Sequence, residues 1–336
     1  MEQSNFWRLF IAPILALAPM EDVTDTVFRE VIRSVSETDA LHVLFTEFTS
    51  TDGLCSDKGR AKVSSRLVVN ESEALLLKNT NTKLVAQIWG SDPQKFYESA
   101  QLISAMGRFD GIDINMGCPV NKVVKKSSCS ALINHPVLAK EIILATKEAT
   151  NLPVSVKTRI GFNTIITEDW ISHLLEVNPA AITLHGRTQK MMSTGLAMWD
   201  EIAKAVQLRN SLNSSTIILG NGDVTSYEIA MNHVQKYGVD GVMVGTGIFK
   251  NPWMFNAHSA DVSLSQKLSL LKKHITLYHK TWGDGGSFNV LKRFFKIYVQ
   301  GFEGAASLRE QLMQTKSCNE ALKVLITMID LDGVRV

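Results

Sequence analysis

Residues 216–220 read Thr-Ile-Ile-Leu-Gly and residues 241–245 read Gly-Val-Met-Val-Gly, and a turn that contains glycine follows each stretch. Short continuous apolar runs of this kind are typical of β-strands that are buried on both faces. Six earlier runs have the same character, which gives eight expected strands; the six lie at residues 14–18, 41–45, 84–88, 111–115, 154–158 and 181–185.

The segments between these runs have helical patterns. Val27, Phe28 and Val31 share one face of a helix that we expect to begin after Thr24 or Asp25, which are suitable N-caps. Further amphipathic helices are expected at residues 93–106, 135–149, 169–177, 199–208 and 226–237. The expected strands begin 25 to 43 residues apart, which suits repeated βα units. We therefore predict an α/β fold, a (β/α)8 TIM barrel.

A dinucleotide-binding Rossmann fold is the structural alternative. It would need a GxGxxG turn directly after its first strand. Here the first expected strand is followed by Pro19-Met20-Glu21-Asp22, so the sequence favours the barrel.

The C-terminal part of the sequence differs in pattern and in charge. From about Val262 onward the strand signals stop and amphipathic helices take over. This part carries 11 basic and 6 acidic residues, a net charge of +5, whereas residues 1–261 carry −3. We predict a catalytic barrel domain over residues 1–258 and a smaller all-helical domain over residues 259–336. The positive charge favours a polyanion as the partner of the helical domain.

Length and composition exclude several classes of protein. With 336 residues, 45% of them hydrophobic and 20% charged, the chain can bury a large core and is not intrinsically disordered. No run approaches the roughly 18 apolar residues of a membrane-spanning helix. The four cysteines are widely spaced without a CxxC pair, which favours a reduced, cytoplasmic protein. Cys118, Cys129 and His135 fit no common zinc spacing, so no metal is expected.

In a barrel of this kind the active site lies at the carboxyl ends of the strands. Asn221-Gly222-Asp223 follows the seventh expected strand, and Gly245-Thr246-Gly247 stands at the end of the eighth. Glycines there let backbone N–H groups approach a phosphate closely, although turn formation alone would also explain the glycines of either turn. A phosphate site beside amide, lysine and histidine side chains suits a flat polar heterocycle such as a flavin; these side chains are Gln87, Asn115, Lys157 and His185.

Cys118 is the most distinctive single residue of the sequence. It follows the fourth expected strand, lies between Gly117 and Pro119, and precedes three lysines within the next eight residues. Nearby positive charge lowers the pKa of a thiol and makes it a usable acid or nucleophile, whereas a buried structural role is the alternative. Lys157, at the end of the fifth expected strand, either stabilises charge on a reduced flavin or forms a salt bridge at the rim.

Several short motifs lie at the ends of the expected strands. The most specific is Asp113-Ile114-Asn115-Met116-Gly117-Cys118-Pro119. The others are LAPMEDVTD at residues 17–25, QIWG at 87–90, VKTR at 156–159, HGRT at 185–188, NGD at 221–223 and NPW at 251–253. With these motifs the sequence resembles the tRNA-dihydrouridine synthases along nearly its whole length. Residues 291–298 (LKRFFKIY) look like the basic RNA-binding helix of that family.

The resemblance implies an oxidoreductase that reduces a specific uridine of tRNA to 5,6-dihydrouridine, with FMN as cofactor and NADPH as electron donor. Hydride from reduced FMN would reach uracil C6, and Cys118 would protonate C5. The implied cofactor-binding residues are Pro19, Met20, Gln87, Lys157, His185, Asn221, Gly222, Asp223, Gly245 and Thr246. The implied uridine-binding, loop-ordering or RNA-binding residues are Asn115, Arg187, Lys292, Arg293 and Lys296. The expected partner is tRNA, and a monomer is expected.

Two positions depart from the usual pattern of the family. Ser127-Ser128-Cys129-Ser130 stands where a glycine-rich loop is usual, and Thr246 stands where an arginine usually helps to hold the flavin phosphate. Threonine brings no charge, so we expect weaker FMN binding unless Arg187 or Lys250 compensates. Three alternatives stay open: a barrel flavoenzyme acting on a small pyrimidine, similar to dihydroorotate dehydrogenases, a non-catalytic RNA-binding relative, and the same chemistry on ribosomal RNA.

Overall fold

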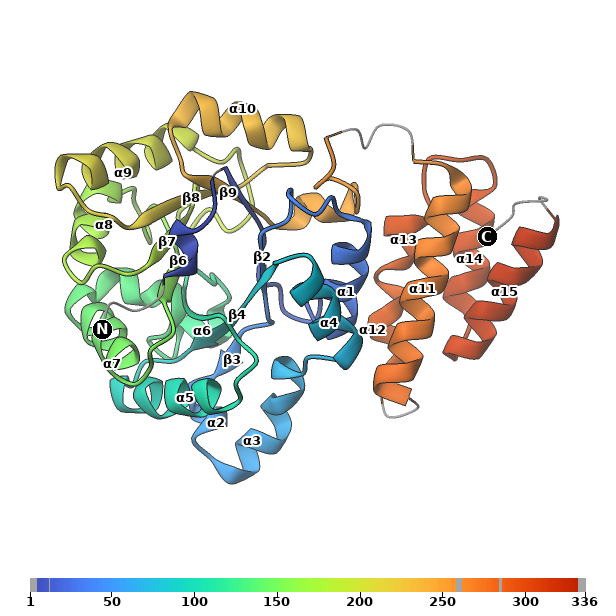
Figure 1. The fold of residues 1–336 in the computed structure, drawn as a ribbon, viewed down its shortest axis with the longest axis horizontal. Coiled ribbons are helices and arrows are strands. Elements are labelled where there is room, and N and C mark those ends of the chain that lie inside the picture. The colour runs from blue at the N-terminus through green and yellow to red at the C-terminus, as the bar shows by residue number, and fades with distance from the viewer. Residues whose placement is uncertain (1–4, 12, 258–261, 284–285, 332–336) are drawn as a thin grey trace.

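The computed structural model describes residues 5–11, 13–257, 262–283 and 286–331. Eight parallel strands form a closed barrel in which the last strand pairs with the first, as Ile14 opposite Gly241 shows (Figure 1). Each strand lies within two residues of the run that predicted it, so the predicted barrel is confirmed. The eight strands are β1 (Ile14–Leu17), β2 (Val43–Phe45), β4 (Lys83–Trp89), β5 (Gly111–Met116), β6 (Val154–Arg159), β7 (Ala181–His185), β8 (Ile217–Asn221) and β9 (Gly241–Val244).

Helices surround the barrel on its outer side (Figure 1). The longer ones are α1 (Thr26–Val35), α4 (Glu71–Asn79), α5 (Pro93–Ala105), α7 (Pro136–Glu148), α8 (Thr167–Leu175), α9 (Trp199–Ser211) and α10 (Tyr227–Tyr237). Asp25 is the N-cap of α1, where its carboxylate accepts a hydrogen bond of 2.8 Å from the Phe28 amide. The shorter elements are η1 (Phe6–Arg8), β3 (Thr49–Ser50), α2 (Thr51–Leu54), α3 (Asp57–Val63), η2 (Ser64–Leu67), α6 (Asn121–Val124), η3 (Cys129–Asn134) and η4 (Thr246–Phe249).

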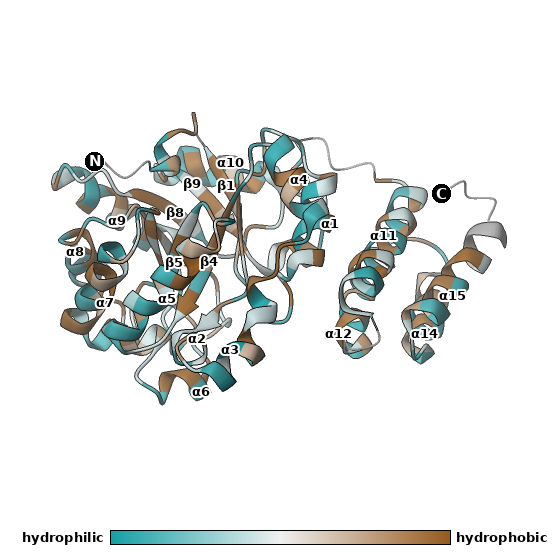
Figure 2. Cartoon of the chain, turned by 60° about the horizontal axis from the view of Figure 1, so that its bottom comes forward, coloured by the Kyte–Doolittle hydropathy of each residue, from teal (hydrophilic) through white to brown (hydrophobic). Residues whose placement is uncertain are grey.

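The hydrophobic core has two layers, one on each face of the closed sheet. Between the sheet and the helices lies the larger layer, and the smaller one fills the barrel, where Phe45 and Met243 are buried. Phe6 and Trp7 of η1 belong to this inner layer and lie at the amino-terminal ends of the strands. Figure 2 shows the brown apolar strands inside the teal polar faces of the helices. Because one end of the barrel is packed with apolar groups, the opposite end is left for polar chemistry.

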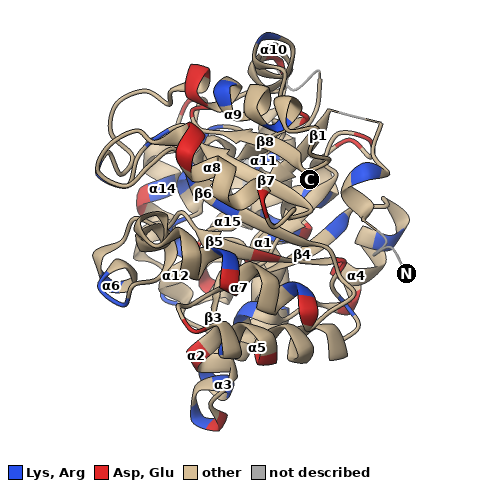
Figure 3. Ribbon diagram, turned by 90° about the vertical axis from the view of Figure 1, so that its left-hand side faces the viewer, with Lys and Arg blue, Asp and Glu red and all other residues tan. Residues whose placement is uncertain are grey.

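The C-terminal region is helical, as predicted. It consists of α11 (Leu264–Trp282), α12 (Phe288–Lys292), α13 (Phe295–Tyr298), α14 (Ala305–Gln314) and α15 (Cys318–Leu331). The basic stretch 291–298 differs from the single helix expected there, because α12 and α13 are separate short helices. The predicted boundary between residues 258 and 259 lies outside the described residues. In Figure 3 the ribbon segments coloured for charged residues lie mostly on helices and loops, with blue and red interspersed.

The helical region packs against α1 of the barrel through an aromatic cluster. The ring of Phe28 lies 5.1 Å from that of Phe294 and 6.0 Å from that of His274, centroid to centroid. The Trp282 indole donates a hydrogen bond of 2.9 Å to Asp25, so the cap residue of α1 also joins the two parts of the chain. No helix in the described part of the chain is long and apolar enough to span a membrane.

Candidate active site

A line of buried polar side chains runs across neighbouring strands near the carboxyl ends of the barrel strands. The register places Gln87 of β4 opposite Asp113 of β5, and Asp113 opposite Ser155 of β6. The Asp113 carboxylate accepts hydrogen bonds of 2.6 Å from both the Gln87 amide and the Ser155 hydroxyl. Burial raises the pKa of Asp113 to about 6, and these two donors oppose the rise. Asp113 therefore fixes the orientation of the Gln87 amide.

Asn115 extends this line to the loop that carries Cys118. Its amide nitrogen donates a 3.0 Å hydrogen bond to the Gln87 carbonyl oxygen. Its own oxygen accepts from the backbone N–H groups of Gly117 at 3.0 Å and Cys118 at 2.9 Å. Because both ends of the Asn115 side chain are held, the backbone of Cys118 has a fixed position relative to the barrel. These hydrogen bonds make Asn115 a loop-ordering residue, and its contact with the uridine stays a prediction.

The Cys118 thiol lies beside a second thiol. A hydrogen bond from the Cys129 side chain lowers the pKa of Cys118 to about 7, with help from the Val120 amide and the positive charges of Arg159 and Lys157, against the effect of burial. Cys129 itself has no exposed surface. The Ser130 hydroxyl donates a 2.8 Å hydrogen bond to the Cys118 carbonyl, which ties the two backbone segments together. The acid predicted from the motif is therefore a thiol that ionises near neutral pH.

Three more predicted residues converge at the ends of β6, β7 and β8. Lys157 donates a 3.1 Å hydrogen bond to the Asn221 side chain, and burial lowers the pKa of Lys157 to about 8. Burial, together with Lys157, Arg159 and Arg187, lowers the pKa of His185 to about 2. The imidazole is therefore neutral at physiological pH, and the group of cations makes this end of the barrel electropositive.

Arg187 connects the loop after β7 to the loop after β8. Its guanidinium donates to the Asp223 carboxylate at 2.6 and 2.7 Å and to the Gly195 carbonyl at 2.6 Å. It lies 3.1 Å from Nε2 of His185. Since arginine only donates, Nε2 accepts and the imidazole proton belongs to Nδ1. Burial raises the pKa of Asp223, but the hydrogen bonds from Arg187 and the Ala197 amide bring it below its usual value.

The two glycine turns lie side by side, because β8 and β9 are neighbours in the barrel. Gly222 and Asp223 have φ angles of 128° and 58°, and the glycine angle is one that side-chain-bearing residues rarely adopt. A methyl group built on Gly245 would make only ordinary van der Waals contacts, with the Ala18 side chain at 3.9 Å and the Asn221 amide nitrogen at 4.0 Å, so this turn is not crowded. Pro19 and Met20 follow β1 next to this turn, since the Ala18 amide donates to the Val244 carbonyl at 2.8 Å.

Cys118 borders a cavity of about 350 Å³. Phe48 and Trp89 supply flat apolar walls, and Lys122 and Lys126 supply positive charge. Arg66 also lines the cavity, where it is paired with the Glu21 carboxylate. The Lys126 ammonium lies 6.0 Å from the centre of the Trp89 ring. The cavity thus combines surfaces for a heterocycle with groups that attract phosphate.

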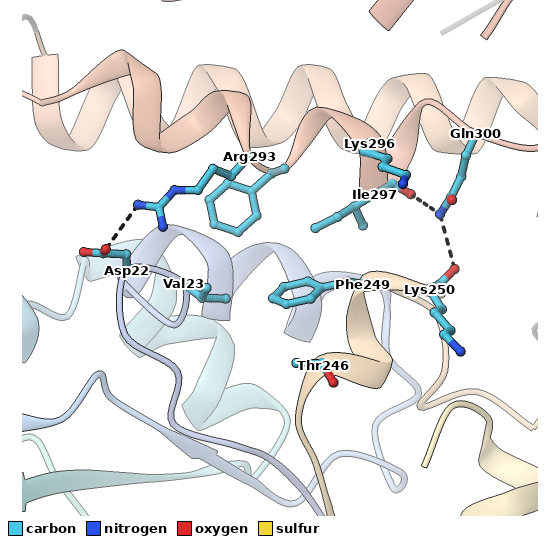
Figure 4. Close-up of a pocket in the computed structure, with 10 residues that line it drawn as sticks. Asp22, Val23, Thr246, Phe249, Lys250, Arg293, Lys296, Ile297 and Gln300 are labelled. Carbon is cyan, nitrogen blue, oxygen red and sulfur yellow. Dashed lines mark hydrogen bonds and ion pairs between the residues drawn. The ribbon is translucent and has the colours of Figure 1, made fainter. Parts of the chain in front are cut away.

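A second cavity, of about 640 Å³, separates the barrel rim from the helical region (Figure 4). Thr246 and Phe249 line it from the barrel, while Arg293 and Lys296 line it from the helical region. In the close-up Arg293 reaches toward Asp22, to which it forms an ion pair of 3.2 Å. Lys292 is not among the residues that line it, and its ammonium donates to the Met313 carbonyl at 2.7 Å. The three basic residues predicted to bind RNA are therefore not equivalent.

Two further residues lie in this site although no role was predicted for them from the sequence. Asp113 is the buried anchor of Gln87, and an acidic residue within an apolar strand was the signal for it. Cys129 touches the predicted acid, but its contact depends on a loop that no periodicity describes. No group of three or more His, Cys, Asp or Glu side chains within the described residues is arranged to hold a metal ion.

The family model described as dihydrouridine synthase matches residues 16–331. The chain belongs to the dihydrouridine synthase family. A "probable tRNA-dihydrouridine synthase" from Staphylococcus aureus (strain MRSA252) is 43% identical over 325 residues, which cover 96% of this chain and 95% of that protein. A "probable tRNA-dihydrouridine synthase 2" from Bacillus subtilis (strain 168) is 39% identical over 323 residues, with coverage of 96% and 95%. The family predicted from the motifs is therefore confirmed, and this dihydrouridine synthase is an oxidoreductase.

Two solved structures also resemble this dihydrouridine synthase. A morphinone reductase variant in complex with tetrahydroNAD aligns with a TM-score of 0.47 at 10% identity, over 72% of this chain and 85% of that one. The old yellow enzyme homologue from Zymomonas mobilis aligns with a TM-score of 0.49 at 11% identity, over 72% and 87% of the two chains.

Proposed function

We propose that this protein reduces a specific uridine of tRNA to 5,6-dihydrouridine, with FMN as its cofactor and NADPH as its electron donor. The observation that carries the proposal is the position of Cys118, a thiol of lowered pKa held by Asn115 beside a group of buried cations. The proposal includes a cytoplasmic monomer, with residues 1–258 as the catalytic domain and 259–336 as the tRNA-binding domain.

The residues at the mouth of the barrel fit FMN. The uncrowded turn at Gly245 suits a phosphate, which backbone N–H groups of the two glycine turns and the Thr246 hydroxyl would hold. Within the part of the chain that the structure describes, the Lys157 ammonium uses one of its three donors, on Asn221, so the other two can serve the polar edge of the ring system. Gln87, Asn221 and the Nδ1 proton of His185 offer further polar contacts. When bound and reduced, FMN supplies the hydride for C6 of the uracil.

Cys118 supplies the proton that completes the reduction. The C5=C6 bond of uracil is conjugated with the C4 carbonyl, so addition at C6 builds negative charge toward C5 and O4. A thiol with a pKa of about 7 is an efficient acid near neutral pH, because a general acid works best when its pKa is close to the operating pH. Asn115 contributes by fixing the Cys118 backbone, and Arg159 contributes by donating a 2.6 Å hydrogen bond to the Gly117 carbonyl.

The target uridine must leave the tRNA stack to reach Cys118, which costs a few kcal/mol. The cavity at Cys118 can receive the extruded nucleotide, because Phe48 and Trp89 offer surfaces for a base and Lys122 offers positive charge for a phosphate. Phosphate contacts to Arg293 and Lys296 at the larger cavity would offset the cost of extrusion.

The test is position-resolved mass spectrometry of tRNA from cells with and without the gene, followed by reconstitution with purified protein, FMN, NADPH and unmodified tRNA. We expect dihydrouridine to vanish at defined positions in the deletion strain and to return in the reconstituted reaction. A protein that reduces free uracil or uridine without RNA would instead be a small-pyrimidine reductase. A protein that binds tRNA but no flavin would be a non-catalytic relative, and loss of dihydrouridine from ribosomal RNA alone would move the activity to that polymer.

A further inference from the structure

Cys118 and Cys129 are the only pair of thiols recorded in mutual contact among the described residues. Both the amide and the hydroxyl of Ser130, the residue after Cys129, donate to the Cys118 carbonyl, at 3.4 and 2.8 Å. The two thiols are also close enough for each to shift the pKa of the other. Two backbone segments that are this close can meet the short Cβ–Cβ distance of a disulfide with little movement. The other two cysteines are elsewhere: Cys55 contacts Ser99, and Cys318 begins α15.

The two thiols differ in access, and this difference assigns each a role. Cys118 is partly exposed and borders the 350 Å³ cavity, which Lys122 and Lys126 also line. A small oxidant that enters this cavity therefore meets Cys118 in an electropositive setting, where the thiolate is favoured. Cys129 is fully buried behind it and is not reached from solvent. This is the arrangement of an attacking cysteine with a resolving cysteine behind it.

We propose that Cys118 and Cys129 form a reversible disulfide when the enzyme meets a hydroperoxide, and that Cys129 thereby protects the catalytic acid from irreversible oxidation. The inference rests on the proposed function only for its effect on catalysis, because the bond itself requires no flavin and no tRNA.

The chemistry balances in two steps. The Cys118 thiolate attacks one oxygen of hydrogen peroxide, the O–O bond breaks, hydroxide leaves, and the sulfur becomes a sulfenic acid while the peroxide is reduced. The Cys129 sulfur then attacks the sulfenic sulfur, the S–O bond breaks, and the thiol proton leaves with the hydroxyl group as water. A dithiol reductant restores both thiols by supplying two electrons and two protons. While the disulfide exists, no thiol proton is available at residue 118.

The local backbone makes the pair testable by mutation. Cys129 has a φ angle of 56°, in the left-handed region that glycine adopts without strain. Cys129→Gly is therefore expected to relieve this strain while it removes the sulfur, and Cys129→Ala removes the sulfur with the Cβ retained. Cys55→Ala is the matched control, because it removes a half-buried thiol that does not touch Cys118.

The experiment uses the full-length protein, hydrogen peroxide, alkylation of the remaining thiols, and tryptic mass mapping. Trypsin cleaves after Lys122 and Lys126, so Cys118 and Cys129 lie on separate peptides, residues 109–122 and 127–140. We expect these peptides to be joined, lighter by two hydrogens than their sum, and to separate after dithiothreitol. Cys55→Ala should give the same product, whereas both Cys129 variants should give sulfinic or sulfonic acid at Cys118.

Sulfinic acid at Cys118 of the unmutated protein, with Cys129 still open to alkylation after unfolding, would overturn the proposal. Because the readout is the mass of two peptides, it does not depend on dihydrouridine formation. A joined peptide in a protein that leaves tRNA unchanged would refute the proposed function and keep the disulfide. Dihydrouridine formation by a protein that gives no joined peptide would refute the disulfide alone.

Discussion

At the scale of single residues, the assignment of Cys118 as the acid makes a direct prediction. Cys118→Ala should bind FMN and accept electrons from NADPH as before, because no cofactor contact is assigned to the thiol. Turnover of tRNA should fall by about 10²- to 10⁴-fold, which is the usual contribution of a positioned general acid. Flavin absorbance measures the first property, and mass spectrometry of the tRNA measures the second. Turnover equal to that of a Cys55→Ala control would refute the role of Cys118.

The pKa of Cys118 also predicts a pH dependence. The thiol must be protonated to donate, and its pKa of about 7 means that the competent form is lost as pH rises through 7. Single-turnover rates should therefore be highest below pH 7 and should decline above it. Cys129→Ala removes the hydrogen bond that lowers the Cys118 pKa most, so the decline should move to higher pH. An unshifted profile would mean that Cys129 does not act on the reacting thiol.

The sequence predicted which residues form the site where they lie near the end of an apolar run. It did not predict the hydrogen bonds between them. Gln87, Asn115, Lys157 and His185 all follow apolar runs, and the structure brings them to one end of the barrel. Their hydrogen bonds depend on strand register, which sets Gln87 against Asp113 and Asn115 against Lys157. A single sequence does not contain that register, because it follows from closure of the whole barrel.

At the scale of elements, one buried ion pair joins α1 to α4. The Arg29 guanidinium donates to the Glu73 carboxylate at 2.6 and 2.8 Å, and neither side chain has exposed surface. Glu73→Ala would leave Arg29 charged and unpaired in the interior, so we expect a loss of about 3–5 kcal/mol in the free energy of unfolding. The exposed Glu71 on the same helix is the matched control, since Glu71→Ala removes a carboxylate without burying a charge. Urea titration followed by circular dichroism measures both, and equal midpoints would contradict the prediction.

The elements differed in how well they could be predicted. Strands buried on both faces are mostly apolar, so their apolar runs mark them almost to the residue. The two-residue strand β3 is too short for any periodicity to show. The stretch 291–298 was expected as one helix, but α12 ends at Lys292 and α13 begins at Phe295. No apolar periodicity in the sequence marks this short interruption.

At the scale of the whole molecule, the prediction concerns the cavity between the barrel rim and the helical region. Lys296 and Arg293 line that cavity and are exposed, whereas the Lys292 ammonium is held by the Met313 carbonyl. Lys296→Glu, alone or with Arg293→Glu, should therefore weaken tRNA binding more than Lys292→Glu does.

The salt dependence of tRNA binding by the double variant tests the same surface. Each lost phosphate contact should reduce the slope of log affinity against log salt by about one. Lys323→Glu on α15 is the control, because it makes the same charge change on a helix that does not line this cavity. Filter binding at several salt concentrations measures the slopes, and flavin absorbance should stay equal in all variants. If Lys323→Glu weakens binding as much as Lys296→Glu, the +5 charge of the C-terminal part attracts RNA as a diffuse field and the cavity is not the docking site.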